Sequence, residues 1–322
     1  MKKTTLANDS ATIGVIGLGI MGGAMARELI KHGHTVVGYD VDRNCMQRLR
    51  KMGGRPLASA TEVASQAATL ISSLSNSAAL AATVAAIADA ARVEGRKPLL
   101  IETSTLPLAD KHQAFTALRR NGVAVLDCPI SGTAERLKQR AWTIYCSGSK
   151  SRCREVEPLL KVFTDSIPYV GTFGNGTKMK FAANHLVAIY NVACAESVTL
   201  ARKMGLDLKD MLALFGPSPV IGTGVMRLRM PFMIRRQYVP ATMKVEVWQK
   251  DMQVIGDMAK SVNCPTPLFS ACAPIYSAAM AQGHSQSDTA SVSEVLAGMA
   301  GIADPPEAGR RLTGNRRKAS GG

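Results

Sequence analysis

The chain has 322 residues, enough for two domains, and its hydrophobic fraction of 46% is sufficient for ordinary buried cores. It contains no run of eighteen or more uncharged apolar residues, so we expect no membrane span, and the N-terminal MKKTTLANDS lacks the apolar segment of a secretory signal. The net charge of +15 suggests nucleic-acid binding, but the basic residues before the tail are dispersed and match no recognisable nucleic-acid-binding motif. We therefore predict a solvated basic surface that favours anionic substrates, and no nucleic-acid partner.

The seven cysteines form an odd set without a CxxC pair, and several lie inside apolar runs such as AVLDCPI and YNVACAE. This pattern favours free, buried thiols over disulfides, and it predicts no metal site. Free thiols are typical of a reducing compartment, so we expect the protein to be cytoplasmic.

The first half of the chain alternates short apolar runs with segments compatible with helices. The runs are almost continuously apolar, as expected of strands that are buried on both faces of a sheet. They lie at 12–17, 35–40, 69–74, 98–103, 123–128 and 143–148. Repeated strand–helix units imply parallel strands joined by right-handed crossovers, so we predict an α/β domain built on a doubly wound parallel sheet.

After residue 171 the pattern becomes helical. A long helix without proline is predicted from Thr177 to Met204, followed by helices at 207–215, 242–263 and 265–283. We predict an N-terminal α/β domain over 10–172 and a C-terminal all-α domain over 173–301, joined by the long interdomain helix. The basic tail, 302–322, is rich in Pro, Gly and Arg and is predicted to be disordered.

A glycine motif of the form GxGxxG follows the first predicted strand directly and opens the first predicted helix. It consists of Gly17, Leu18, Gly19, Ile20, Met21 and Gly22. In this context Gly17 allows a tight turn, Gly19 lets the backbone approach a pyrophosphate, and Gly22 lets the helix pack closely on the strand. The N–H groups at the start of the helix then face the phosphates, so we predict that the first domain is a Rossmann domain that binds a dinucleotide.

Asp40, at the end of the second predicted strand, is the acid expected about 20 residues after the glycine motif. Its carboxylate would bind the 2′-hydroxyl of the adenine ribose and repel a 2′-phosphate, which favours NAD. Arg43, three residues on, leaves NADP open as the alternative.

The long predicted helix carries two polar residues on one face within GTFGNGTKMKFAANHL. Lys180 and Asn184 are four residues apart, whereas Lys178 points elsewhere. Because Phe181 and Ala182 beside them are apolar, we predict that this pair faces inward. A lysine on a helix is more often exposed to solvent, and the spacing alone leaves that alternative open.

Together these motifs resemble those of the β-hydroxyacid dehydrogenase family. The segment GLGIMGGAMARELIKHGH is similar to the cofactor motif of that family, and DCPISG at 127–132 is similar to its substrate loop. GNGTKMKFAANH resembles the catalytic helix, and WQKDM at 248–252 resembles the C-terminal lysine motif. The resemblance extends over residues 12–300, and four motifs in the same order make it specific.

The resemblance implies a role for each matching residue. Lys180 would be the catalytic lysine, which takes the hydroxyl proton or returns it, and Asn184 would fix the geometry. Because the pKa of an ordinary lysine is about 10.4, this role requires burial or a neighbouring charge to lower it. The residues that would bind the substrate are Ser131, Gly132, Thr133 and Lys250. Beyond the glycine motif and Asp40, those that would bind the cofactor are Leu74, Ser75, Thr105 and Lys250. The resemblance also implies a homodimer or homotetramer.

Four positions depart from the family pattern, and they surround the substrate pocket. Two glycines are replaced by Thr133 and Arg140, a proline by Ser75, and a second asparagine by Ala183. We therefore do not transfer the identity of any one substrate.

The sequence thus predicts an NAD(P)-dependent oxidoreductase, with NAD favoured, that interconverts a small 3-hydroxy carboxylate and its semialdehyde or keto acid, like 3-hydroxyisobutyrate dehydrogenases. Tartronate semialdehyde, succinic semialdehyde and threonate are alternative substrates within the family. An imine reductase has the same architecture, but imine reductases generally lack a lysine at the position of Lys180. A non-catalytic NAD(H)-binding sensor is the alternative outside enzymes.

Overall fold

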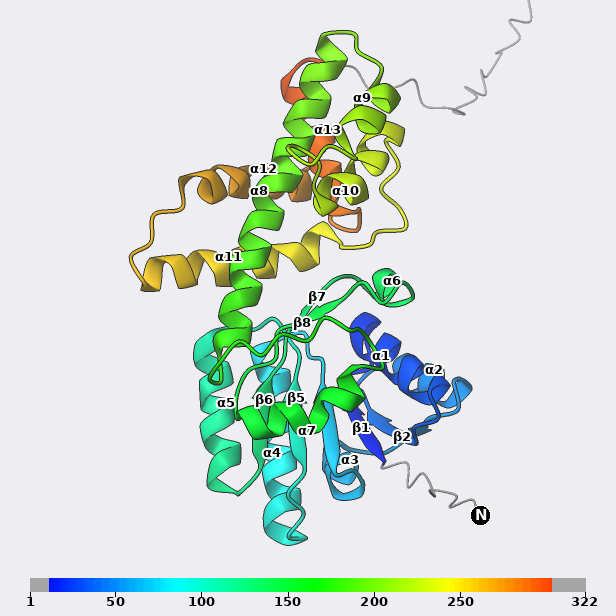
Figure 1. Ribbon diagram of the computed structural model, residues 1–322, viewed down its shortest axis with the longest axis vertical. Coiled ribbons are helices and arrows are strands. Elements are labelled where there is room, and N and C mark those ends of the chain that lie inside the picture. Colours follow the sequence, from blue (N-terminus) through cyan, green and yellow to red (C-terminus); the bar gives the residue numbers. More distant parts are fainter. Residues whose placement is uncertain (1–11, 303–322) are drawn as a thin grey trace, which may run out of the picture.

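The computed structural model describes residues 12–302, which form a sheet-containing part and a helical part joined by one long helix (Figure 1). Of the basic tail predicted over 302–322, residues 303–322 lie outside the described residues. Residues 10 and 11 of the first predicted domain also lie outside them.

The first part is built on a six-stranded sheet in which every pair of neighbouring strands is parallel. Its strands are β1 (Ile13–Ile16), β2 (Val36–Tyr39), β3 (Arg55–Pro56), β4 (Thr69–Ser72), β5 (Leu99–Glu102) and β6 (Ala124–Asp127). Their order, β3-β2-β1-β4-β5-β6, is that of a doubly wound dinucleotide-binding sheet. Successive strands are added on one side of β1 up to β3 and on its other side from β4 onward, so the strand order switches between β1 and β4. The predicted fold class is confirmed.

Helices cover both faces of this sheet. One face packs against α1 (Ile20–Lys31), α2 (Arg43–Lys51), α6 (Ala134–Leu137) and α7 (Lys150–Leu160). The other face packs against α3 (Ala60–Gln66), α4 (Ser77–Val93) and α5 (Leu108–Arg120). Strands β1 and β5 are buried at all four positions, which explains why these runs are apolar throughout rather than alternating.

The run at 143–148 does not continue the parallel sheet as the sequence suggested. Only Thr143–Ile144 forms a strand, β8, and it pairs antiparallel with β7 (Ile130–Ser131). A parallel pairing needs a crossover, usually a helix, that returns the chain over the sheet, whereas the connection from β6 to β8 contains only β7 and the four-residue α6. The sixth strand of the main sheet is instead the edge strand β3, which is too short to leave a pattern in the sequence.

The second part is helical and surrounds α8, a helix of 29 residues (Asn175–Lys203) that rises out of the sheet-containing part in Figure 1. The other helices are α9 (Leu208–Phe215), α10 (Gly224–Arg235), α11 (Val245–Ser261), α12 (Pro267–Ala281), the short 3-10 helix η1 (Thr289–Ser291) and α13 (Val292–Met299). Four of the long helices agree with the predicted ranges to within three residues, whereas α10 and α13 were not predicted. Helices α11 and α12 extend to one side of α8 as an arm (Figure 1).

The cysteines agree with the expectation of free thiols. All seven are unpaired, and all except Cys264 are buried. Within residues 12–302, none of the helices combines the length and the apolar character needed to cross a membrane.

Candidate active site

The glycine loop between β1 and α1 shows which of its glycines the protein itself requires. A Cβ at Gly17 or Gly22 would overlap backbone atoms, the carbonyl oxygen of Ser73 in the first case and that of Gly17 in the second. A Cβ at Gly19, by contrast, would meet nothing within 4 Å. Packing within the chain therefore explains two glycines but not Gly19. Open space above that backbone is what a bound pyrophosphate needs, so the loop fits a dinucleotide.

Asp40 closes the other side of this loop. Its carboxylate accepts the backbone N–H of Leu18 at 2.6 Å through Oδ2 and the N–H of Asp42 at 2.8 Å through Oδ1. Each carboxylate oxygen keeps a second lone pair, so the fixed carboxylate can still accept hydrogen bonds from ribose hydroxyls.

A cavity of about 470 Å³ lies between the glycine loop, Asp40 and the loop after β4. Its lining includes Gly17, Gly19, Asp40, Leu74 and Ser75. Leu74 is held in place because its N–H donates to Ser104 Oγ at 2.8 Å, in the loop after β5. The carboxyl ends of β1, β2 and β4 therefore line the predicted cofactor site, and the loop after β5 supports it through Ser104, as in other doubly wound sheets.

Ile20 and Met21, the remaining residues of the glycine motif, lie in different surroundings. Ile20 is exposed, whereas Met21 packs against the core under α1. Their backbone forms the first turn of α1, and their side chains do not line the cavity described above.

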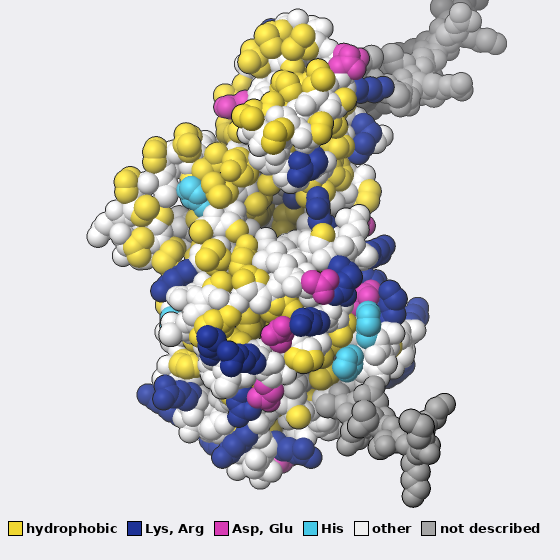
Figure 2. Space-filling view, viewed as in Figure 1, with side chains coloured by type: hydrophobic (Ala, Val, Ile, Leu, Met, Phe, Trp, Pro, Cys, Tyr) yellow, Lys and Arg dark blue, Asp and Glu magenta, His cyan; other side chains and the backbone are white. Residues whose placement is uncertain are grey.

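Lys180 and Asn184 both lie on the buried face of α8, as their spacing predicts. Lys180 is only 9% exposed and Asn184 only 4%, whereas Lys178 is exposed. Both line a second cavity, of about 370 Å³, and Ser131, Gly132 and Thr133 line the same cavity from the other part of the protein. The structure thus brings the predicted catalytic pair and the predicted substrate loop together. Figure 2 shows a hollow between the two parts with Lys and Arg side chains near it.

Asp251 on α11 is a site residue that the sequence analysis did not single out. Its Oδ2 accepts a hydrogen bond from Asn184 Nδ2 at 2.9 Å. The neighbouring Lys250 places its Nζ 3.7 Å from Asp251 Oδ1 and donates to the carbonyl oxygen of Thr105 at 2.9 Å. A continuous set of contacts therefore links the cofactor-side loop after β5 to Asn184, across the boundary between the two parts.

The electrostatics of this cluster favour proton exchange at Lys180. Burial lowers the pKa of Lys180 to about 8, with the charge of Lys250 acting in the same direction and the charge of Asp251 opposing them. Burial likewise raises the pKa of Asp251, while Lys250, Lys180 and the hydrogen bond from Asn184 oppose that rise. A lysine with a pKa near 8 is present in both protonation states around neutral pH, as a general acid and base must be.

The start of α8 is fixed to the sheet by a buried polar cluster. Thr177 donates its backbone N–H to Asp127 Oδ2 at 2.8 Å, and its hydroxyl donates to Asp127 Oδ1 at 2.8 Å. Lys111 Nζ lies 2.6 Å from Asp127 Oδ1 and 2.5 Å from Glu102 Oε2, with all three side chains buried. At Gly176, a Cβ would press against the carbonyl oxygens of Asp127 and Tyr145. The glycine therefore permits the close approach that places Lys180 one turn further along.

Two of the unusual residues of the substrate loop fit the backbone there. Arg140, at one of the positions where the resemblance led us to expect glycine, adopts the left-handed conformation with φ +53°. Its guanidinium compensates by donating to the carbonyl oxygen of Lys161 at 2.9 Å and pairing with Asp165 at 2.9 Å. Thr133 precedes α6 with φ −97°, so this position does not need glycine for its conformation. His185 stacks on Phe269, in keeping with a packing role.

Both parts of the chain match known protein families. Residues 12–171 match the NAD binding domain of 6-phosphogluconate dehydrogenase, and residues 174–296 match the family described as NAD-binding of NADP-dependent 3-hydroxyisobutyrate dehydrogenase. The chain belongs to the β-hydroxyacid dehydrogenase family. It is accordingly an NAD(P)-dependent hydroxyacid dehydrogenase of Rossmann and helical-domain architecture.

Relatives within the family match over most of their length. The chain is 27% identical to L-threonate dehydrogenase of Cupriavidus necator, covering 90% of this chain and 97% of that one. It is also 27% identical to the mitochondrial 3-hydroxyisobutyrate dehydrogenase of Homo sapiens, covering 88% and 86%. A crystal structure of 3-hydroxyisobutyrate dehydrogenase from Salmonella typhimurium superimposes with a TM-score of 0.78 at 25% identity, covering 88% of this chain and 99% of that one.

Proposed function

We propose that this dehydrogenase interconverts a small 3-hydroxy carboxylate and its semialdehyde or keto acid, with Lys180 as the general acid and base. The observation that carries the proposal is the buried Lys180, whose pKa is lowered to about 8, in the same cavity as Asn184 and the Ser131–Gly132 loop. Names of relatives support 3-hydroxyisobutyrate or threonate as substrates.

The residues of the candidate site have distinct tasks in this reaction. The bound nicotinamide dinucleotide supplies hydride chemistry at its ring. Neutral Lys180 Nζ takes the hydroxyl proton of the alcohol during oxidation, and protonated Lys180 returns it during reduction. Asn184, fixed by Asp251, orients the hydroxyl or the lysine, and Ser131 and Gly132 bind the substrate carboxylate. Lys250 connects α11 to Thr105 and so holds the two parts of the site together.

A parallel screen of small hydroxy acids with NAD and with NADP tests this function. Glycerate, 3-hydroxyisobutyrate, 3-hydroxypropionate, 4-hydroxybutyrate and threonate are the informative substrates, with initial rates of NAD(P)H formation as the measurement. Turnover of at least one of them is the expected result. Binding of NADH without turnover of any of them would support a non-catalytic sensor instead.

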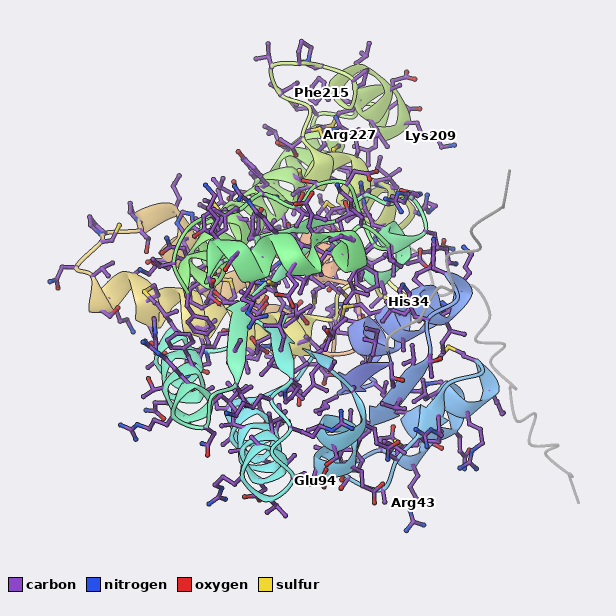
Figure 3. The ribbon with its side chains drawn as sticks, turned by 60° about the horizontal axis from the view of Figure 1, so that its bottom comes forward. His34, Arg43, Glu94, Lys209, Phe215 and Arg227 are labelled. Carbon is purple, nitrogen blue, oxygen red and sulfur yellow. The ribbon has the colours of Figure 1, made fainter. Side chains whose placement is uncertain are left out.

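We propose NAD as the preferred cofactor, because the Asp40 carboxylate is fixed by two backbone N–H groups and would repel a 2′-phosphate. Arg43, the residue that left NADP open, extends outward from the start of α2 (Figure 3) and lines a neighbouring cavity together with Asp40, so NADP is the alternative that the test below decides. Asp40→Asn keeps an oxygen acceptor but removes the charge. It should lower the ratio of kcat/KM for NAD to that for NADP by about 10- to 100-fold, the effect of one charge-assisted hydrogen bond.

The matched control for Asp40 is Asp42→Asn. Asp42 lies two residues away and caps α2 through the N–H of Asn44, but it does not line the cavity. Its variant should keep the cofactor ratio of the wild type. A wild-type enzyme that prefers NADP would contradict the role given to Asp40.

Asp251→Asn should lower kcat by about 10- to 100-fold, because Asn184 loses a charged acceptor in a buried site. It should also lower the pKa of Lys180 further, since the negative charge of Asp251 is what opposes the effect of burial. The pH profile of oxidation would then shift toward lower pH. Asp257→Asn, an exposed site on the same helix, is the control and should leave both kcat and the profile unchanged. A lowered kcat with an unmoved profile would mean that Asp251 acts only through the geometry of Asn184.

We also propose that the protein acts as a homodimer or homotetramer in the cytoplasm. Large apolar side chains are exposed on α8 and on the arm of α11 and α12, among them Leu186, Leu200 and Leu268. Figure 2 shows apolar side chains over much of this arm. A surface that exposes several large apolar side chains is typical of an interface between subunits. Six buried free thiols support a reducing compartment.

A further inference from the structure

Several polar side chains that line the Lys180 cavity already have partners within the protein. Asn184 donates to Asp251, and Thr223 Oγ1 accepts the N–H of Met226 at 3.0 Å. Arg229 is bound to Asp288 at 2.5 Å and to Thr242 at 2.7 Å, so its charge is compensated. These groups shape the cavity, but their hydrogen bonds are not available to a substrate without loss.

Thr133 and Arg136 are two neighbouring groups among the lining side chains that have no such partner. The side chain of Arg136 makes no hydrogen bond or ion pair with any residue between 12 and 302, and the buried Thr133 Oγ1 has no hydrogen-bond partner within this range. They are three residues apart, at the start of α6 and within it. A buried hydroxyl without a partner costs free energy, and such a group is often completed by a ligand.

The charge of the cavity is also one-sided. Lys180, Arg136 and Arg229 line it, whereas no Asp or Glu is among its lining residues. Since Asp288 compensates Arg229, Arg136 is the permanent charge that is left without a counterion among the residues the structure describes. A guanidinium matches the geometry of a carboxylate or phosphate through two parallel hydrogen bonds, so an anion is the ligand that fits here.

The backbone around these two groups is fixed before any substrate binds. The backbone carbonyl oxygen of Thr133 accepts a hydrogen bond from Trp142 Nε1 at 2.7 Å, which fixes the backbone at this residue. The side-chain hydroxyl of Thr133 is the group that has no partner among the described residues. A Cβ at Gly132 would overlap the Trp142 ring, which keeps the loop closely packed on that side chain. At the other end of the segment, Arg140 is anchored to Lys161 and Asp165. The loop therefore holds Thr133 and Arg136 at a defined place in the cavity.

We propose that Thr133 Oγ1 and Arg136 form a second anion subsite, so that the preferred substrate carries an anionic group in addition to the carboxylate held by Ser131 and Gly132. The second group is a carboxylate or a phosphate ester. This inference rests on the proposed function for the position of the first carboxylate. It gives the replacement of glycine by Thr133 a role in selecting the substrate.

Binding to the enzyme–NADH complex, measured by isothermal titration calorimetry, tests the subsite without relying on turnover. Succinate and butyrate are the probes, because they differ by one carboxylate. Succinate should bind about 10- to 100-fold more tightly than butyrate, the effect of one charge-assisted contact. Arg136→Gln should abolish this difference, and Thr133→Val should reduce it. Lys180→Ala should retain it even though turnover is lost.

Turnover provides the second arm and distinguishes the two anions. The carboxylate pair is 3-hydroxyisobutyrate and 2-(hydroxymethyl)succinate, and the phosphate pair is threonate and 4-phosphothreonate. In the pair that matches the natural substrate, Arg136→Gln should raise KM for the dianion about 10- to 100-fold while leaving kcat close to the wild-type value. Lys138→Gln, an exposed lysine of the same segment that does not line the cavity, should change neither constant.

Three outcomes would overturn the proposal. The first is equal binding of succinate and butyrate by the wild-type complex. The second is a loss of affinity for both succinate and butyrate by the same factor in Arg136→Gln, because Arg136 would then bind the single carboxylate of an ordinary substrate. The third is an equal effect of Lys138→Gln, which would reflect general charge. Discrimination between the probes without turnover of any hydroxy acid would instead contradict the proposed function and leave the subsite standing.

Discussion

Replacing Lys180 by alanine is expected to lower turnover of the hydroxy acid by about 10²- to 10⁴-fold, the contribution of a well-placed general acid or base. NADH should bind as tightly as to the wild type, because Lys180 does not line the cavity of the glycine loop and Asp40. Initial rates and fluorescence titration with NADH measure the two quantities. Lys178→Ala, at an exposed lysine two residues earlier on the same helix, is the control that should keep full activity.

The pH profile of the wild type tests whether Lys180, the group that the alanine variant lacks, carries the proton. With the pKa of Lys180 lowered to about 8, the neutral lysine needed for oxidation accumulates above pH 8 and the protonated form needed for reduction accumulates below it. The rate of oxidation should therefore rise through pH 8, and the rate of reduction should fall through the same range. Lys180→Ala should lack this transition in both directions. Retained turnover in the variant would remove Lys180 from the mechanism.

The sheet was predictable because its strands are buried on both faces. Strands such as β1 and β5 must be apolar at every position, and this leaves a clear signal in the sequence. The two residues of β3 include Pro56 and are only partly covered, so no pattern marks them. Helix α10 was missed for another reason. Its buried face includes Arg229, which is tolerated only because Asp288 lies 59 residues further along the chain and is brought to it by the fold.

The site was predictable where one element carries the chemistry. Lys180 and Asn184 are four apart on one helix, so their common face follows from the helical repeat. Asp251 was not predicted, although it interrupts the buried stripe of Trp248, Met252 and Ile255 on α11. That interruption is a signal, but its meaning depends on Asn184, which is 67 residues away in sequence. Residues that act through another element become visible only once the elements are packed.

The strongest example is Lys111, whose replacement by methionine should lower the free energy of unfolding by about 3–5 kcal/mol. Lys111 lies on the buried face of α5 together with Ala114 and Leu118 and is fully buried. Its Nζ lies 2.6 Å from Asp127 Oδ1, 2.5 Å from Glu102 Oε2 and 2.9 Å from Thr177 Oγ1. Burial acts to lower the pKa of Lys111, but the carboxylates of Asp127 and Glu102 outweigh it and raise the pKa, so the lysine stays charged. Removing it leaves two carboxylates buried without a cation. Urea denaturation measures the loss.

The size of this loss separates a buried ion cluster from a surface pair. Arg92→Ala removes an exposed ion pair with Asp89 and should cost no more than about 1 kcal/mol. Because Lys111 and Asp127 share one network, the double variant Lys111→Met/Asp127→Asn should cost less than the sum of the single variants by about 0.5–3 kcal/mol. Strict additivity, or a cost for Lys111→Met as small as that for Arg92→Ala, would contradict the cluster.

The same cluster also positions the helix that carries Lys180. Asp127 accepts the backbone N–H of Thr177 at the start of α8. The Lys111 variant should therefore also lose part of its kcat, because α8 is then less firmly placed.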